Sequence, residues 1–359
     1  MKLDIIVQFL QVLVVSLGVL ANSTYATPII SHNEREKMMI SIPYPKIFHE
    51  NYRHDLDFLA IGDWGLPGPG KDSVAAAMET WAKNNDTLFV INVGDNFYQT
   101  NSSDYDGVLS VHDPRWNSVW LDAYRGKLAE IPWYTVAGNH DWYTNVTAQV
   151  DYYWTVNQRF FFPSLYYVRV SKFGKMNTKV AWIHIDTDPF AYNYSSLDNR
   201  NDMKENLGIL KLNTTKEIQE KLDWIEEQLK CVQDAKWIFV VGHHTLIGKC
   251  RDQYYLSKLP PLFERYRVTA YFAGHSHMLE VESVNSTSPV TYFTTGAASI
   301  HDLKGCKGAS WSAPGGTMGF LHVRIRDDED KMNFEFINAT TAGSPPEVIY
   351  KGSLKVRER

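Results

Sequence analysis

Cysteine is scarce in this sequence of 359 residues, which contains only Cys231, Cys250 and Cys306. So low a cysteine content excludes a small scaffold held together by several disulfides. One bridge among the three would leave a free thiol. All three pairings, and the alternative of three unpaired thiols, stay open at this point. Low-complexity tracts and repeats at a fixed period are also absent, and the chain is long enough for one large α/β domain.

An excess of basic residues is lacking as well. The chain has 36 lysines and arginines against 41 acidic residues, a formal net charge of −5. This balance provides no positive field for nucleic acid, so no polyanionic partner is expected. Hydrophobic residues make up 44% of the chain, with 11 tryptophans and 20 tyrosines, which favours a large packed core.

The N-terminal apolar run, residues 5–20, is short and is interrupted by Gln8 and Gln11. A transmembrane helix needs about 20 mainly apolar residues, so a membrane anchor and stable membrane insertion are disfavoured. Because Lys2 precedes the run and small residues follow it, residues 1–26 are predicted to be a secretory signal peptide. Residues 27–52 are interpreted as a lead-in on the outside of a domain that spans 53–359.

Seven Asn-x-Ser/Thr sequons without proline follow this segment. A single sequon often arises by chance, but seven after a signal peptide favour an exported glycoprotein. The predicted glycosylation sites are Asn85, Asn101, Asn145, Asn193, Asn213, Asn285 and Asn338.

Hydrophobic periodicity predicts strands mixed with helices, followed by a C-terminal series of short strands. Strands are predicted at 56–61, from 89 to a turn at 94–98, and at 132–137, 179–185, 237–241, 268–273, 290–295, 319–325, 332–337 and 348–352, with an extended pair over 159–170. Helices are predicted at 72–83, 115–128, 144–154, 216–230 and 260–266. Polar loops are predicted at 101–114 and 192–215, the second of them exposed.

Five of the predicted strands end in the same way, with a glycine followed by a side chain that can bind a metal. These ends supply Asp63, Asp95, Asn139 with His140, His243, and His275 with His277. In Gly-His-x-His, alternate positions place both imidazoles on one side of the chain. Because ligands gather beyond the carboxyl ends of strands in α/β sheets, these residues are expected to converge.

Mixed carboxylate, amide and imidazole ligands suit iron, manganese and zinc. The set is too large for one ion, so a pair of ions is expected, about 3.5–4 Å apart as in two-metal hydrolases. Asp95, at the tip of a central strand, is the candidate bridging ligand.

The blocks GDWG, GDNFY, AGNHD, VVGHH and AGHSH, in that order, resemble the five motifs of the metallophosphoesterase superfamily. The resemblance is to purple acid phosphatases, in particular the small, animal-type tartrate-resistant enzymes, and it extends from Asp57 to the C-terminus. Tyr98 distinguishes this branch, because the related protein Ser/Thr phosphatases read GDxxDRG there. The resemblance implies an α/β (α+β) metallophosphoesterase fold, a four-layer α-β-β-α sandwich of two mixed β-sheets.

The resemblance also implies a role for each motif residue. The ligands of a ferric ion would be Asp63, Tyr98 and His277, with Asp95 bridging to a second ion, Fe(II) or Zn(II) with Mn as an alternative, held by Asn139, His243 and His275. Asn139 and His140 would bind the substrate phosphate, and His140 and Asp95 would take part in catalysis. The nucleophile would be metal-bound hydroxide, and a tyrosinate–iron(III) bond would colour the protein.

The implied activity is that of a secreted or lysosomal acid phosphatase acting on phosphate monoesters, either small molecules or phosphoproteins. A monomer is expected. One alternative is a phosphodiesterase or nucleotide phosphohydrolase on the same scaffold. A second is a secreted glycoprotein with a non-catalytic binding or immune-modulating role, against which the complete ligand set argues.

The sequence departs from the family pattern at three places. His244-Thr245 stands where the family reads Tyr-Pro, and His244 is interpreted either as a substrate contact or as a side chain turned away from the metals. The motif GHSHML replaces the usual Gly-His-Asp-His, which bears on substrate preference. No cysteine occurs at 190–192, so Cys250 lacks its usual partner. The loop 192–215 matches a segment cleaved in mammalian members, and an activating protease is hypothesised as a partner.

Overall fold

The computed structural model describes residues 47–100, 105–192, 203–248, 255–283, 288–303 and 309–357. All of them belong to the larger of two compact units, Met39–Arg359. The predicted signal peptide, most of the predicted lead-in, three of the seven sequon asparagines (Asn101, Asn193 and Asn285), Cys250 and Cys306 lie outside the described residues. Cys231 is an exposed, free cysteine. In the part of the chain that is described, no helix is long and apolar enough to cross a membrane.

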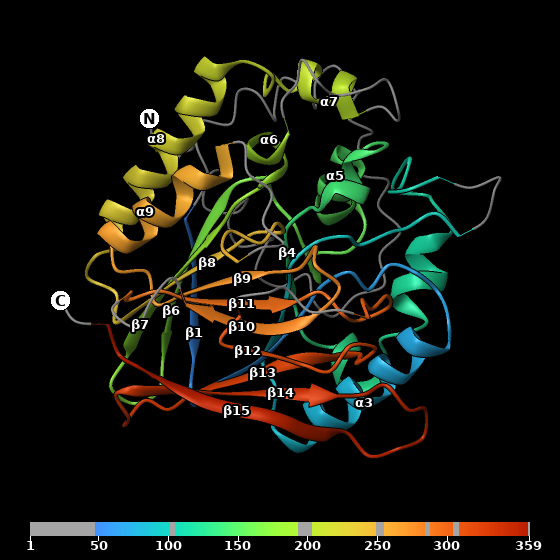
Figure 1. Cartoon of the computed structure of the whole chain (residues 1–359), viewed down its shortest axis with the longest axis vertical. Helices are drawn as coiled ribbons and strands as arrows, with labels where there is room; N and C mark the ends of the chain where they lie inside the picture. Colours follow the sequence, from blue (N-terminus) through green and yellow to red (C-terminus); the bar gives the residue numbers. More distant parts are fainter. Residues whose placement is uncertain are drawn as a thin grey trace, which may run out of the picture. The chain divides into compact units, whose positions relative to one another are not determined.

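Two mixed β-sheets form the centre of this unit (Figure 1). The eight-stranded sheet runs in the order β1 (Ile47–Tyr52), β6 (Tyr167–Phe173), β7 (Thr178–His184), β8 (Trp237–Val241), β9 (Ala270–Ala273), β11 (Thr291–Thr295), β10 (Leu279–Ser283) and β12 (Trp311–Ser312). The seven-stranded sheet runs in the order β15 (Glu347–Lys355), β14 (Lys331–Asn338), β13 (Gly319–Ile325), β2 (Leu56–Ile61), β3 (Phe89–Asn92), β4 (Trp133–Thr135) and β5 (Phe160–Phe161).

The central strands β2, β3, β8 and β9 are buried on both faces, because a sheet faces each of them on one side and helices on the other. In β2, Phe58 belongs to the apolar cluster between the sheets, and its neighbour Leu59 belongs to the cluster on the helix side. The inter-sheet cluster is rich in aromatic rings; Phe58 and Phe89 stack at 5.1 Å between ring centroids. This two-sided burial accounts for continuous apolar strands in place of an alternating pattern.

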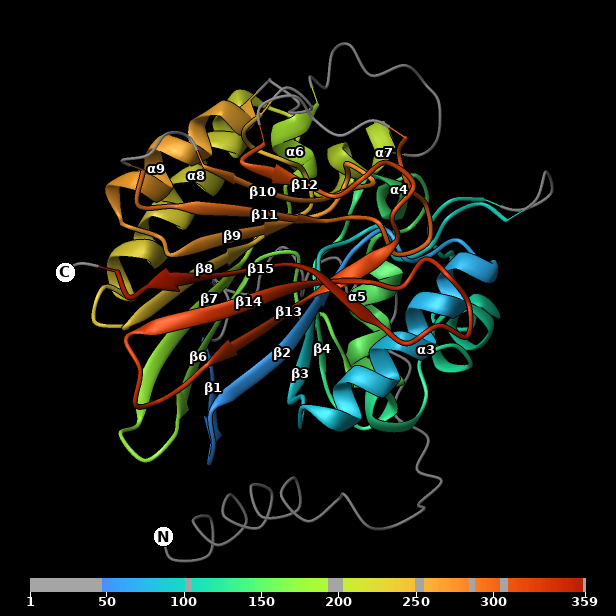
Figure 2. The same cartoon turned by 60° about the horizontal axis from the view of Figure 1, so that its bottom comes forward.

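Helices complete the outer layers, so the predicted four-layer sandwich is confirmed. Figure 2 shows α8 (Thr215–Cys231) and α9 (Leu259–Arg265) outside the eight-stranded sheet and α3 (Pro69–Asn84) outside the seven-stranded one. The amphipathic α8 buries Ile218, Leu222 and Ile225 and begins with a Thr214–Glu217 capping box. The remaining helical segments are α4 (Asn139–Trp142), α5 (Thr147–Thr155), α6 (Asp188–Ala191), α7 (Met203–Ile209), the π-helix η2 (Trp116–Leu121) and the 3-10 turns η3 (Gly126–Ala129) and η5 (Tyr255–Lys258).

Three sequence-based predictions differ from the structure. The helix predicted at 115–128 is split into η2 and η3, because Arg125 is extended and Gly126, the first residue of η3, takes a positive φ of 56°. Residues 47–52, predicted as part of the lead-in, form β1, which pairs in parallel with β6 at the edge of its sheet.

The third difference concerns the loop predicted at 192–215, which contains the helix α7. Met203, Leu207 and Leu212 are buried in the core, so this part of the loop is not the exposed polar segment that its charges suggested. Met203 and Leu207 stand one helical turn apart, but the charged residues between them in the sequence obscure this spacing. Residues 193–202 of the hypothesised cleavage segment lie outside the described residues.

His322 ties three neighbouring strands together through a buried ion network. From β13 its Nε2 lies 2.9 Å from Asp57 Oδ2 on β2, and its Nδ1 lies 3.1 Å from Glu335 Oε2 on β14. Burial by itself lowers the pKa of His322, but the hydrogen bonds and charges of Asp57 and Glu335 outweigh it and raise the pKa. The network therefore favours the protonated imidazole in the folded state.

The substitution His322→Gln tests this network through the pH dependence of stability. The folded-state pKa lies above the unfolded value of about 6.5, so the stabilisation is complete below that pH and is lost as pH rises through the folded pKa. We expect the substitution to lower the free energy of unfolding by about 1–2 kcal/mol more at about pH 5 than at about pH 9, as measured by urea unfolding. The exposed His54, changed to Gln, is the control. If the loss in free energy of unfolding did not depend on pH, the charged network would be contradicted.

Candidate metal centre

Turns after five strands, β2, β3, β4, β8 and β9, meet at one end of the two sheets. All seven predicted metal ligands lie on these turns, and each contacts at least one of the others. They are Asp63, Asp95, Tyr98, Asn139, His243, His275 and His277. The structure therefore brings together residues that are spread over more than half of the sequence.

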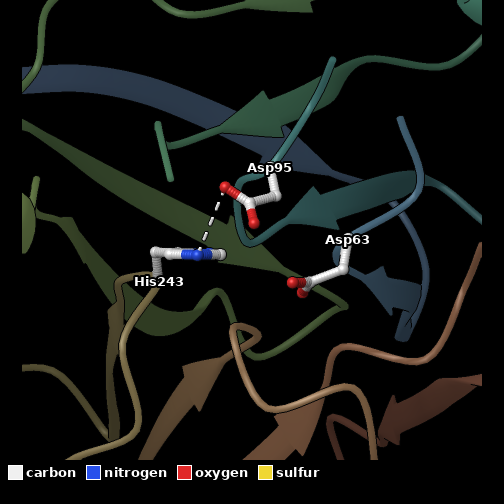
Figure 3. A group of neighbouring side chains, drawn as sticks. All are labelled: Asp63, Asp95 and His243. Carbon is white, nitrogen blue, oxygen red and sulfur yellow. Dashed lines mark ion pairs between the residues drawn. The ribbon is translucent and has the colours of Figure 1, made fainter. Parts of the chain in front are cut away.

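Three of these side chains form a compact, buried group. Ligand atoms of Asp63, Asp95 and His243 all lie within 4.8 Å of one another. Figure 3 shows the two carboxylates and the imidazole gathered around a common space, with Nε2 of His243 3.4 Å from Oδ1 of Asp95. Two carboxylates buried this close together need positive charge between them, and this group is where a cation fits.

The other four side chains extend the group in two directions. Tyr98 and His277 lie on the Asp63 side: Oη of Tyr98 is 3.2 Å and Nε2 of His277 is 3.6 Å from Oδ1 of Asp63. Asn139 and His275 lie on the His243 side, where Oδ1 of Asn139 is 3.2 Å from His243 Nε2 and 3.0 Å from His275 Nδ1.

Asp95 contacts both sides, with a different oxygen toward each. Its Oδ2 accepts a hydrogen bond of 2.7 Å from Oη of Tyr98, and its Oδ1 is the atom that faces His243. Oδ1 also accepts the backbone N–H of His140 at 3.0 Å. One carboxylate thus presents an oxygen to each half of the site.

Three of the clustered residues have left-handed backbone conformations. The φ angles are +56° at Asp63, +55° at Asp95 and +67° at His275, and each residue follows a glycine at the end of its strand. Such angles are uncommon for residues other than glycine, and they concentrate at functional sites. Here the turn ends the strand abruptly and leaves each side chain among the others at the strand tips.

Two glycines are required because neighbouring side chains occupy the space of a Cβ atom. A Cβ on Gly138 would lie 2.3 Å from Oδ1 of Asp95, and a Cβ on Gly274 would lie 2.3 Å from Oδ2 of Asp63. Real Cβ contacts are never this short, so any other residue would displace a carboxylate of the site.

A buried hydrogen-bond network supports the turns that carry Asp95 and Asn139. The carboxylate of Asp141 accepts from the backbone N–H of Asn96 at 3.1 Å, from Gly138 N at 2.9 Å and from Gln149 Nε2 at 2.7 Å. The amide of Asn92 donates to Asn96 Oδ1 at 2.6 Å. Such a connected network makes the two turns rigid.

The pKa values of the buried group follow from burial and mutual charge. Burial, with the negative charge of Asp95, raises the pKa of Asp63 well above its usual value. Burial also raises the pKa of Asp95, but the charges of His243 and His140 outweigh it and hold that pKa well below its usual value. Burial lowers the pKa of His243, yet Asp95 raises it to about 10. Burial and both carboxylates raise the pKa of Tyr98 well above its usual value.

His140 lies beside the group, and Asp106 holds its ring. Nδ1 of His140 is 2.8 Å from Oδ1 of Asp106, and the imidazole packs at 4.3 Å from the ring of Tyr98. Burial lowers the pKa of His140, but Asp95 and Asp106 outweigh that effect and raise it. No motif pointed to Asp106, because it stands in a segment predicted only as a polar loop.

His244 is fully buried behind the group. Its Nδ1 is 2.9 Å from Oγ1 of Thr187, and its ring centroid is 4.4 Å from that of His275. The side chain therefore packs against a predicted ligand from the side away from solvent. Tyr143, which no motif indicated, accepts a hydrogen bond from the amide of Asn139 at 3.0 Å. Its spacing of four residues from Asn139 is the only sequence signal that could have found it.

Comparisons with known proteins agree with this geometry. The profile of the family described as calcineurin-like phosphoesterase matches residues 56–279. Tartrate-resistant acid phosphatase type 5 of Rattus norvegicus is 30% identical over 85% of this chain and 91% of its own length. The Homo sapiens protein of that name is 33% identical over 69% of this chain and 74% of its own length. Purple acid phosphatase 7 of Arabidopsis thaliana is 32% identical over 68% of this chain and 70% of its own length. The chain belongs to the calcineurin-like phosphoesterase family, in the branch of the purple acid phosphatases.

Solved structures share the fold of this phosphoesterase. GAP50 of Plasmodium, described as the anchor in the inner membrane complex, superposes with a TM-score of 0.70 at 24% identity, covering 86% of this chain and 90% of GAP50. The purple acid phosphatase PPD1 from yellow lupin superposes with a TM-score of 0.55 at 13% identity, covering 87% of this chain and 55% of PPD1. These likenesses establish the predicted metallophosphoesterase fold.

The substitution Gly138→Ala tests the close packing of Gly138 against the carboxylate of Asp95. The added methyl group would collide with Oδ1 of Asp95. A misplacement of about 1 Å at a reacting centre can cost about 100-fold in rate, so we expect a loss of that order in kcat/KM together with a lower metal content. Gly343→Ala is the control, since nothing lies within 4 Å of the Cβ position of Gly343. Its φ of +77° makes alanine less favourable for the backbone there than at Gly138, whose φ is −117°, so the control is a stringent one. Full activity of Gly138→Ala would contradict the packing described above.

Proposed function

We propose that this phosphatase hydrolyses phosphate monoesters in acid at a dinuclear centre containing Fe(III) and either Fe(II) or Zn(II). The observation that carries the proposal is the division of the seven side chains into two groups that share Asp95. The two carboxylate oxygens of Asp95 face opposite groups, which is the arrangement that a bridging ligand requires. The similarity to tartrate-resistant acid phosphatases supports the acid phosphatase assignment.

The donor sets of the two groups suit different ions. Asp63, Tyr98 and His277 would hold the ferric ion, because carboxylate and phenolate oxygens offer the negative charge that a trivalent ion needs. Burial between two carboxylates raises the pKa of Tyr98, so only a strongly positive partner favours its ionised form. Asn139, His243 and His275 would hold the divalent ion, with one amide oxygen and two imidazoles. When bound, the ions would neutralise the phosphate charge and lower the pKa of water.

The protein groups beside the metals would position the substrate and move a proton. His140 lies beside Tyr98 and Asp95 but is itself only partly buried, so its ring can reach a bound phosphate ester. Asp106 occupies Nδ1, which leaves Nε2 to face the leaving-group oxygen. His140 would therefore stabilise the phosphate and donate a proton to the departing alkoxide. The raised pKa of His140 keeps its proton in place in the acid range.

Export to a lysosome or an acidified extracellular space is part of the proposal. The predicted signal peptide and the seven sequons support it. The four sequon asparagines within the described residues, Asn85, Asn145, Asn213 and Asn338, are only partly buried. A single chain is proposed to be sufficient for activity, because all seven predicted ligands come from one polypeptide.

Metal analysis with a visible spectrum tests the proposed centre. We expect two metal ions per chain, one of them iron, and a broad tyrosinate–iron absorption band that Tyr98→Phe abolishes. Rates on p-nitrophenyl phosphate should exceed those on the bis(p-nitrophenyl) ester, and the opposite order would favour the phosphodiesterase alternative. A colourless, metal-free protein with full activity would contradict the proposal. An iron-loaded, inactive protein would favour a non-catalytic role.

The substitution Asp106→Asn tests the role of His140. An amide holds the imidazole less firmly than a carboxylate, so proton donation should weaken and kcat should fall about tenfold on alkyl phosphates. On p-nitrophenyl phosphate, whose leaving group needs no proton, we expect a much smaller effect. Asp122→Asn, at an exposed position, is the control. Equal losses on both substrates would show that Asp106 serves the structure of the loop and not proton transfer.

A further inference from the structure

The amide of Asn139 is held at both ends. Its Oδ1 lies 3.2 Å from Nε2 of His243 and 3.0 Å from Nδ1 of His275, the two imidazoles that would share the divalent ion with it. Its Nδ2 donates a hydrogen bond of 3.0 Å to Oη of Tyr143. The side chain is almost fully buried, at 5% exposure, so its orientation depends on these contacts.

The orientation of this amide matters because its two ends differ in chemistry but hardly in shape. Only the oxygen can bind a cation, whereas the NH₂ group is a donor and repels one. Rotation of the amide by half a turn exchanges the two ends at almost no steric cost. The hydrogen bond from Nδ2 to Tyr143 engages the NH₂ group on the far side while both imidazoles face the oxygen, and together these contacts favour the orientation with the oxygen toward the metal.

Tyr143 is fixed firmly enough to act as that partner. It follows α4 directly and stands one helical turn after Asn139, and its ring lies 5.1 Å from that of His140. The residues on either side of it are tied to neighbouring segments. Asn206 of α7 donates to the backbone oxygens of Trp142 and Thr144, and Oγ1 of Thr144 donates to the backbone oxygen of Asp106 at 2.7 Å.

We propose that Tyr143 is a positioning residue for the divalent half of the centre, which holds Oδ1 of Asn139 toward the ion. The inference rests on the proposed dinuclear function and adds to it a residue outside the ligand motifs. Hydrogen-bond partners of metal ligands contribute to metal affinity by fixing ligand orientation, and their loss costs about 10–100-fold. Tyr143 makes its contribution without touching the ion.

The substitution Tyr143→Phe removes the acceptor and keeps the ring. In protein loaded with iron in the first half of the site, we expect the Kd for Zn²⁺ to rise about tenfold, measured by competition with a chromophoric chelator. The tyrosinate–iron band and the iron content should be unchanged, because Tyr98, Asp63 and His277 lie in the other half. Tyr266→Phe, which removes a hydroxyl bonded to Glu226 on α8, is the matched control and should leave the Kd for Zn²⁺ unchanged.

The variant Asn139→Asp separates positioning from a general structural role. A carboxylate has an oxygen at both ends, so it needs no partner to choose between them. In the Asn139→Asp background, Tyr143→Phe should change the Kd for Zn²⁺ less than about twofold. A merely structural role of Tyr143 would weaken Zn²⁺ binding equally in both backgrounds and would overturn the proposal.

Two further outcomes are decisive. An unchanged Zn²⁺ affinity in Tyr143→Phe, or a loss of iron equal to the loss of zinc, would overturn the positioning role. If the unsubstituted protein bound neither iron nor zinc, the proposed dinuclear function would fail instead. The two failures are therefore distinguishable.

Discussion

The negative charge of Asp95 is the constraint on which the arrangement of this site depends. Its carboxylate is buried between Tyr98, His243 and the backbone N–H of His140, where an ionised group is costly unless positive charge and hydrogen bonds surround it. The neighbouring imidazoles hold its pKa low, and that retained charge raises the pKa of His243 in return. A cation between Asp95 and Asp63 would satisfy both carboxylates at once.

The fold places this charge by means of strand ends. Parallel strands from both sheets stop at the same end of the sandwich, and left-handed turns at Asp63, Asp95 and His275 direct side chains inward at that point. The turns are strained, and glycines and the network around Asp141 hold them. Strain of this kind persists only where the surroundings determine it on every side. The backbone turns of the site, and with them the side chains that they carry, are therefore held rigidly.

Residues beside the proposed ligands adapt this general design. Asp106 comes from a loop and contacts Nδ1 of His140, which in the proposed mechanism would leave Nε2 for the substrate. Tyr143 and His244 support Asn139 and His275 from behind. These three side chains are where this chain's own metal affinity and substrate preference are expected to be set, since they contact proposed ligands without being ligands themselves.

The sequence by itself determined most of the strands, most of the longer helices, the fold class and all seven clustered side chains. It could do so because buried strands are continuous apolar runs and each motif is local, a few residues after a strand end. It did not determine β1, β10, β12, α7 or the division of η2 from η3, since strand pairing and burial among charged neighbours depend on distant contacts. Only the tertiary structure decided that Asp95 faces two groups, that His244 is buried, and that Asp106 and Tyr143 hold His140 and Asn139. Some of those contacts join segments that lie far apart in the chain, and no periodic pattern relates such segments. The others depend on the orientation of a side chain, which the spacing of residues does not encode.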